Sequence, residues 1–420
     1  MNSEAFQHVT LPVFNRFKDI HVAIPKIRKS LAGEDTLIKL LIIGASGMTG
    51  RALLEAAVAC VWFQVIAFTR NRKHLMDNQH VTKGEVKIVE GDMLEQKTLQ
   101  QAMVDVDVVF FTTFYWETRN SECEYQQGLN VVEAATKAHI KHLLYVGTPY
   151  ANKYAEVKCK LLIGRERVQK LVLKSGVPST VIQMGFYYEN LLSLFKPHPV
   201  DKTTYALALP MENLALNCGS ILDFAHCIAK IILQPAAHFG QIIKLSTGHH
   251  TVTQLAAWLD RHFPNLNFYD PKIPMEEYKK IIFDGSEEIY SWFMSCHAFP
   301  CNLKWDQKQT YQLCPSARSF QDWLEENDKV FLQCLEEETE GSNLEPDVGG
   351  ESNTISSSTY EKWNISESLK PGESKKLNTM VVFRTREEEN NFERRAVLCN
   401  EVTVRWSFLD LWSQLFHFDG

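Results

Sequence analysis

The sequence predicts an α/β fold, with a doubly wound, Rossmann-type parallel sheet, a smaller α/β C-terminal lobe and a disordered acidic tail. From residue 38 onward, short apolar runs alternate with segments of helical period, as in successive βαβ units. The apolar runs are nearly continuous, which suits strands covered on both faces. A glycine-rich loop, GASGMTG, follows the first run directly. The chain has 420 residues, 45% of them hydrophobic, and can therefore bury a core of this size.

Six strands with right-handed crossovers are expected in the sheet. They span residues 38–43, 63–69, 86–90, 107–113, 142–148 and 179–185. One helical segment follows Gly47, and others occupy 98–103, 123–138 and 165–176. This order of elements makes residues 38–185 the Rossmann part of the chain.

Beyond residue 185 the pattern loosens and predicts a smaller lobe over the carboxyl ends of the strands. Its expected elements are a strand at 241–246 and helices at 220–233, 252–262, 286–295 and 316–332. The globular part therefore covers 38–335, with the smaller lobe at 186–335.

The two ends of the chain differ from the globular part. Residues 1–37 form an N-terminal extension, and 336–380 are rich in Glu, Ser, Gly and Pro, which predicts a disordered acidic linker. Residues 381–420 form a C-terminal segment of no assigned role. With 44 basic against 51 acidic side chains, the net charge is −7, and the excess acid lies in this tail. Direct binding to nucleic acid is therefore not expected.

Ten cysteines without a CxxC pair indicate a reducing compartment. The start lacks a secretory signal, and no apolar run is long enough to span a membrane. We expect a cytoplasmic protein, and the nucleus is a second candidate location. A homodimer is a candidate assembly. The paired spacing of zinc ligands is not found among Cys296, His297, Cys301 and Cys314, so no metal is expected.

The glycine loop is the strongest chemical signal, because it follows a buried strand and opens a helix. Gly44 would allow the tight turn, Gly47 the approach of a pyrophosphate, and Gly50 the packing of helix on strand. Backbone N–H groups and the helix N-terminus would hold the phosphates. The other loop residues in this predicted cofactor site are Ala45, Ser46, Met48 and Thr49. The alternative is a turn that merely connects strand to helix.

The end of the second strand indicates which cofactor is preferred. An NAD binder would place a carboxylate there, whereas this chain has Arg70, Asn71, Arg72 and Lys73. A guanidinium can bind a 2′-phosphate that a carboxylate would repel, so NADP(H) is preferred over NAD(H). A solvated basic turn is the alternative interpretation.

The ends of the third and fourth strands extend the predicted site. Asp92 and Met93 could meet the adenine edge, although Asp92 could equally cap the following turn. Thr113, Phe114 and Tyr115 follow the fourth strand, where the ribose and nicotinamide should pass.

Four segments together resemble the NmrA-like proteins, atypical members of the short-chain dehydrogenase/reductase superfamily. They are GASGMTG, TRNRK at 69–73, TFYWE at 113–117 and GFYYENLL at 185–192. The resemblance runs from about residue 37 to 332. It implies that the nicotinamide end of the cofactor is bordered by Tyr187, Tyr188, Glu189 and Asn190. The residues alone allow an aromatic helix start packed in the core.

Active members of that superfamily use a Tyr-xxx-Lys pair, in which the Lys lowers the pKa of the Tyr. Tyr154 and Lys158 match the letters but begin only six residues after Thr148. The alternative alignment puts Leu161 and Arg165 in the catalytic slot. Arg165 cannot donate a proton at neutral pH, but its charge could hold ribose or phosphate oxygens.

These features predict an NADP(H)-binding regulatory protein without catalytic residues, a redox sensor that changes its association with a protein partner. The alternative is an NADPH-dependent oxidoreductase of a small carbonyl or quinone, with Tyr154 as its acid. A third interpretation is a cofactor-free scaffold that docks through its acidic tail.

Overall fold

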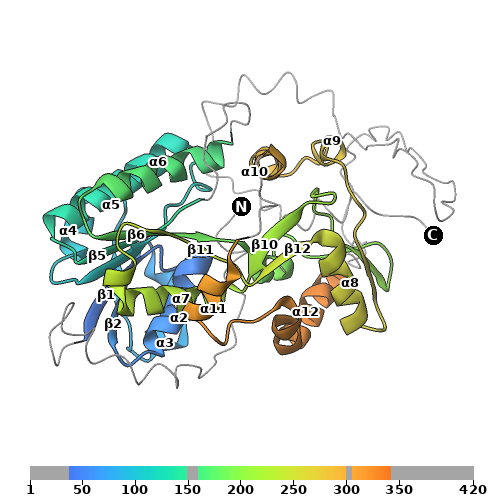
Figure 1. Ribbon diagram of the computed structural model, residues 1–420, viewed down its shortest axis with the longest axis horizontal. Helices are drawn as coiled ribbons and strands as arrows, with labels where there is room; N and C mark the ends of the chain where they lie inside the picture. Colours follow the sequence, from blue (N-terminus) through green and yellow to red (C-terminus); the bar gives the residue numbers. More distant parts are fainter. Residues whose placement is uncertain (1–36, 149–158, 299–304, 342–420) are drawn as a thin grey trace, which may run out of the picture.

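The computed structural model describes residues 37–148, 159–298 and 305–341 (Figure 1). The predictions made for the N-terminal extension, for Tyr154 and Lys158, and for the tail beyond residue 341 lie outside these ranges. Within them, no helix combines the length and apolarity that crossing a membrane requires.

A seven-stranded parallel sheet forms the centre of the fold, in the order β11-β6-β5-β4-β1-β2-β3. Its strands are β1 (Ile38–Ile43), β2 (Phe63–Thr69), β3 (Lys87–Glu90), β4 (Val108–Phe111), β5 (His142–Val146), β6 (Ser179–Met184) and β11 (Ile242–Leu245). The continuous apolar runs form the buried central strands, so the predicted Rossmann-type sheet is confirmed. The order reverses between β1 and β4, and ligands of open α/β sheets bind at such a switch point.

The strand expected at 241–246 belongs to this sheet rather than to the smaller lobe. It is β11, which pairs in parallel with β6 through Ile243 and Ile182. Buried and exposed residues alternate along β11, as on an edge strand. That alternation predicts a strand, but it carries no information about which sheet the strand joins.

Helices cover both faces of the sheet (Figure 1). One face carries α2 (Met48–Val58), α7 (Ile221–Leu233) and α11 (Gln307–Leu313), and the other carries α4 (Gln96–Ala102), α5 (Ser121–Lys137) and α6 (Lys160–Lys174). The short η3 (Arg72–Leu75) and α3 (Gln79–Thr82) follow β2. Eleven of the 13 residues of α7 are buried, because this helix packs between α2, α11 and the sheet.

The second lobe has its own aromatic core between two small sheets and several helices. Its sheets pair β12-β10-β7 and β13-β9-β8. The strands are β7 (Phe186–Tyr187), β8 (His198–Pro199), β9 (Thr204–Ala206), β10 (Ala215–Gly219), β12 (Gly248–Thr251) and β13 (Asn267–Tyr269). The helices are η4 (Tyr188–Leu192), α8 (Val252–His262), α9 (Met275–Tyr278), α10 (Ser286–Ala298) and α12 (Phe320–Gly341), and η5 (Pro235–Ala237) follows α7. The smaller α/β lobe expected from the sequence is thus present.

Candidate functional site

The glycine loop between β1 and α2 has two positions that only glycine suits. Gly44 has a φ of +85°, and a Cβ there would lie 2.7 Å from Cγ2 of Thr112. A Cβ on Gly50 would lie 2.1 Å from the Gly44 carbonyl oxygen, so α2 could not pack on the loop. A Cβ on the exposed Gly47 would only reach ordinary contact distance, 3.4 Å from the same oxygen. Contacts within the protein therefore do not require glycine at position 47. The close approach of a ligand would explain why glycine is found there.

The first turn of α2 is not capped by a side chain. Gly47 occupies its N-cap position, and among the described residues no side-chain cap hydrogen bond forms there. Unsatisfied N–H groups at a helix N-terminus make a site for phosphate oxygens. The loop and this turn are thus built as an anion site at the switch point of the sheet.

Arg51, which the sequence analysis did not single out, fixes the loop. Its Nε donates to the carbonyl oxygen of Ser46 at 3.1 Å, and its guanidinium also pairs with Asp77 at 2.9 Å and bonds to the carbonyl of His74. It therefore ties the glycine loop to the segment after β2. The sequence signal that could have identified Arg51 is its position directly after Gly50, the last glycine of the motif.

The four polar residues after β2 have different surroundings. The Arg70 guanidinium pairs with Glu117 and lies 5.7 Å from the ring centroid of Phe114. Asn71 instead caps η3, accepting the Lys73 N–H at 3.0 Å. Arg72 and Lys73 are exposed on η3. Arg70 and Glu117 are both about half-exposed, so their pair contributes about 0–1 kcal/mol, and a phosphate dianion could displace the carboxylate.

The residues after β3 serve the fold. Asp92 accepts the Leu94 N–H at 2.8 Å, which confirms that it caps the turn. The Met93 side chain is buried in the core on the α4 and α5 face of the sheet, and its carbonyl accepts from Asn130 at 2.9 Å. The Met93 side chain thus packs in that core, and its contact with adenine stays a prediction.

Thr113 belongs to a partly buried polar group, named here the Arg165 cluster and made of Thr49, Thr113, Glu124, Tyr145, Arg165 and Tyr187. The carboxylate of Glu124 on α5 lies at its centre. Its Oε1 accepts from Thr113 at 2.9 Å and from Nε of Arg165 at 3.2 Å. The Tyr145 hydroxyl lies 3.2 Å from that of Thr113. Burial raises the pKa of Glu124, while the charge of Arg165 opposes this shift.

Tyr187 connects this cluster to the glycine loop. Its hydroxyl bonds to the side chain of Thr49 in the first turn of α2, and it lies close enough to Arg165 for that charge to affect its pKa. Burial raises the pKa of both Tyr145 and Tyr187. The structure thus brings together the predicted residues Thr49, Thr113, Arg165 and Tyr187. Glu124 and Tyr145 were missed, although Glu124 stands on the buried face of a predicted helix.

The next two residues, Tyr188 and Glu189, make contacts away from the glycine loop. The Tyr188 hydroxyl lies 3.3 Å from that of Thr247, and its ring packs on Phe320 and Trp323. Glu189 accepts from Ser220 Oγ at 2.6 Å, from the Ile221 N–H at 2.9 Å and from Nε1 of Trp323 at 3.2 Å.

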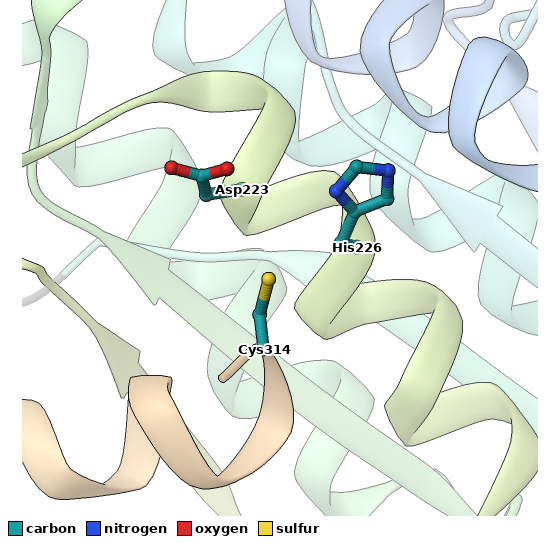
Figure 2. Close-up of side chains that lie close together, drawn as sticks. All are labelled: Asp223, His226 and Cys314. Atoms are coloured by element: carbon teal, nitrogen blue, oxygen red, sulfur yellow. The ribbon is translucent and has the colours of Figure 1, made fainter. Parts of the chain in front are cut away.

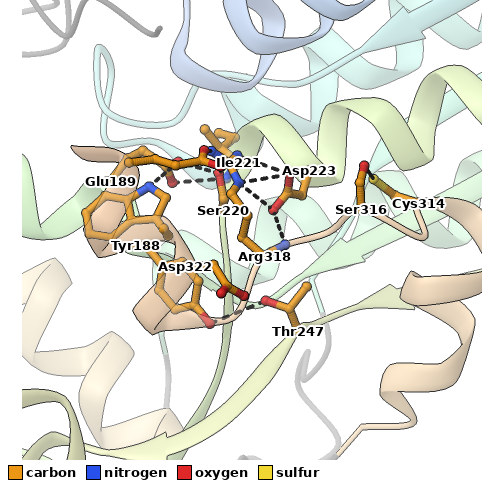
Figure 3. Close-up of polar contacts among 12 residues, drawn as sticks. Tyr188, Glu189, Ser220, Ile221, Asp223, Thr247, Cys314, Ser316, Arg318 and Asp322 are labelled. Atoms are coloured by element: carbon orange, nitrogen blue, oxygen red, sulfur yellow. Dashed lines mark hydrogen bonds and ion pairs between the residues drawn. The ribbon is translucent and has the colours of Figure 1, made fainter. Parts of the chain in front are cut away.

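Figure 3 shows these contacts inside the second lobe. The backbone turns into η4 at Tyr188, so the side chains after Tyr187 face the second lobe instead of the loop. The alternative of an aromatic segment packed in the core therefore holds for Tyr188 and Glu189. Asn190 is half-buried, and its carbonyl accepts from Ser193 and Phe195.

Phe114 and Tyr115 take different places. Phe114 is half-buried beneath Arg70, and its N–H donates to Gln127 at 2.9 Å. Tyr115 is fully buried against Leu161 and Leu162 of α6. Its hydroxyl has no hydrogen-bond partner among the described residues, and burial raises its pKa to about 12.

The fold and this loop define a Rossmann-type protein with an anion site at its switch point. A model of the NmrA-like family matches residues 37–323. The chain therefore belongs to the NmrA-like family.

Several relatives are similar to this chain. The oxidoreductase flvB of Aspergillus flavus, which has an NmrA-like family domain, is 26% identical over 216 residues, 51% of this chain and 68% of the relative. Quinone oxidoreductase 2 of Escherichia coli is 25% identical over 228 residues, 53% of this chain and 73% of the relative.

Solved structures share the fold. NmrA, a negative transcriptional regulator, in complex with NADP matches with a TM-score of 0.62 at 19% identity, over 73% of this chain and 98% of that one. The quinone oxidoreductase QOR2 of E. coli with NADPH matches with a TM-score of 0.58 at 20% identity, over 68% and 99%.

Proposed function

We propose that this protein binds NADP(H) at the glycine loop and acts as a regulatory redox sensor, without turning over a substrate. The uncapped turn of α2 and the unrestrained Gly47 support phosphate binding at the loop. Arg70 supports preference for a 2′-phosphate, because its guanidinium stands at the end of β2 and its ion-pair partner Glu117 is half-exposed. Relatives named as a regulator in complex with NADP and as NADPH-dependent reductases support the same cofactor.

The observation that carries the absence of turnover is the Arg165 cluster. A tyrosine acid works near neutral pH when a neighbouring cation lowers its pKa. Here burial raises the pKa of Tyr145 and Tyr187, and the neighbouring cation Arg165 is bound to Glu124. The cluster is therefore suited to hold a ribose or phosphate oxygen rather than to exchange a proton.

Tyr187 provides a route from cofactor to partner. It contacts Thr49 at the loop and is the last residue of β7, which pairs with β10 in the second lobe. A cofactor that moves this hydroxyl thereby acts on the second lobe. A sensor requires that the oxidised and reduced forms bind the partner-competent state with different affinities.

Binding of NADPH, NADP⁺ and NADH to the full chain, measured by calorimetry, tests the cofactor assignment. Arg70→Ala should weaken NADPH by about 10- to 100-fold, because hydrogen bonds to a charged group contribute about 1.5–3 kcal/mol. NADH affinity should not change. Arg72→Ala is the matched control on the exposed side of η3. Equal NADPH affinity for Arg70→Ala and wild type would contradict the assignment.

Hydrogen exchange of the full chain tests the sensor. NADPH and NADP⁺ at saturation should protect 113–117 and 185–192 to different extents, and the difference should extend to β10. Identical protection with both forms would exclude a sensor that works through Tyr187.

An NADPH-dependent oxidoreductase is the second candidate, favoured by the similarity to flvB and to quinone oxidoreductase 2. It predicts NADPH oxidation with a member of a panel of quinones and aldehydes, and loss of that activity in Tyr154→Phe. Binding without turnover supports the sensor, whereas no binding at all leaves the cofactor-free scaffold.

A further inference from the structure

A second polar cluster lies on the α7 and α11 side of the sheet and includes none of the residues of the Arg165 cluster. It consists of Asp223 and His226 on α7 and Cys314 directly after α11. A carboxylate oxygen, an imidazole nitrogen and the sulfur all lie within 4.8 Å of one another. Figure 2 shows the three side chains converging from the two elements.

The local fold fixes these three positions. Asp223 and His226 are three residues apart on α7 and therefore share one face of that helix. α11 packs against α7, and Cys314 sits at its C-cap, where its N–H donates to the Thr310 carbonyl at 2.8 Å. Asp223 and Cys314 are buried, whereas His226 is half-buried.

We propose that Asp223, His226 and Cys314 form a binding site for a divalent transition-metal ion of the Zn²⁺ type. Thiolate, imidazole and carboxylate are the donors that Zn²⁺ takes, usually in tetrahedral geometry. A fourth donor is adjacent, because the thiol of Cys227 is hydrogen-bonded to Cys314. Cys227 also contacts the Thr310 carbonyl at 3.7 Å, so it would have to turn from that oxygen to bind the ion.

Arg318 holds the carboxylate in place. Asp223 accepts from the Arg318 N–H at 2.8 Å and from its Nε and Nη2 at 3.0–3.2 Å. These four hydrogen bonds place two donors on each oxygen, with Nε shared between them, so a metal ion would take the place of one Nε contact. Outer hydrogen bonds of this kind orient metal-binding carboxylates.

The charges around the cluster also admit a cation. Arg318 pairs with Glu326 at 2.9 Å as well as with Asp223, so its charge faces two carboxylates. A Cys314 thiolate would add a further negative charge. Binding here is independent of the dinucleotide proposal and can be tested without any cofactor.

Titration of the full-length reduced protein with Co²⁺, a spectroscopic substitute for Zn²⁺, tests the site. We expect one equivalent to bind with a thiolate-to-cobalt charge-transfer band and visible d–d bands, and Zn²⁺ to remove both. Cys314→Ser should abolish the charge-transfer band. His226→Gln should keep the band but weaken Co²⁺ binding at least tenfold.

Cys60→Ser, a buried thiol at the end of α2, is the matched control and should bind like wild type. A wild-type protein without a charge-transfer band, or a band that survives in Cys314→Ser, would overturn the proposal. If circular dichroism shows that Cys314→Ser does not fold, Co²⁺ binding by His226→Gln is the test, because His226 is only half-buried. A Co²⁺ affinity equal to that of wild type would then reject the site.

Discussion

Glu189 provides the sharpest test of how the second lobe is held together. Its Oε1 accepts from Ser220 and Trp323, and its Oε2 accepts from the N–H of Ile221. In Glu189→Gln the amide NH₂ must replace one of these oxygens. On the Oε2 side it would face the Ile221 N–H, and on the Oε1 side it would face the Trp323 N–H. Either orientation sets a donor against a donor in a fully buried place.

The expected cost follows from this geometry. A buried donor left without an acceptor costs about 1–3 kcal/mol, so Glu189→Gln should lower the free energy of unfolding by that amount. Trp323→Phe removes one donor and keeps an aromatic ring against Tyr188 and Phe320, so it should cost about 1 kcal/mol.

The double variant, Glu189→Gln with Trp323→Phe, tests whether these two side chains interact. Without the indole N–H, the glutamine can place its oxygen toward Ile221 and its NH₂ toward the Ser220 hydroxyl, which can accept. The double variant should therefore lose less stability than the sum of the two single variants, by about 1 kcal/mol. Urea unfolding followed by circular dichroism measures all three, with the exposed Glu287→Gln as control. Strict additivity, or a Glu189→Gln variant as stable as wild type, would refute the assignment.

Three further predictions concern other parts of the chain. Gly50→Ala should lower the melting temperature, because its Cβ would meet the backbone of Gly44, whereas Gly47→Ala should keep it and weaken NADPH binding in calorimetry. Glu117→Gln should strengthen NADPH binding up to about fivefold, since it releases a half-exposed ion pair worth about 0–1 kcal/mol. Burial holds the pKa of folded His142 at about 3, below its ordinary 6.5, so only the unfolded chain takes up this proton between those values. Stability should therefore fall by about 1.4 kcal/mol per pH unit below about 6.5, and urea unfolding should show a smaller loss in His142→Gln.

The central sheet could be predicted because its signal is local. Each buried strand is an uninterrupted apolar run, and the loop GASGMTG marks the first crossover. β11 shows the limit of such signals, because its alternating residues indicate an edge strand without naming its neighbour. Only the tertiary pairing with β6 assigns it to the main sheet.

The site could be predicted in part, for a related reason. The loop glycines and Arg70 act through backbone and charge at fixed points of a βαβ unit. Glu189 could not be placed, because its partner Trp323 is 134 residues away. Glu124 and Arg165 are 41 residues apart, so no spacing rule joins them. The same holds for Asp223 and Cys314, which are linked by helix packing and by no motif.

The long sequence separation between α2 and α7, which pack together, affects how the protein folds during synthesis. α2 ends at Val58, and α7, which covers it, begins at Ile221. At about 5–20 residues per second, the roughly 160 intervening residues take on the order of ten to thirty seconds to synthesise. During that time the helix that covers the apolar side of α2 has not been made. β6, once made, remains an open edge until β11 follows. The core of the amino-terminal half is therefore completed only after α7 and β11, which lie beyond residue 185, have been translated.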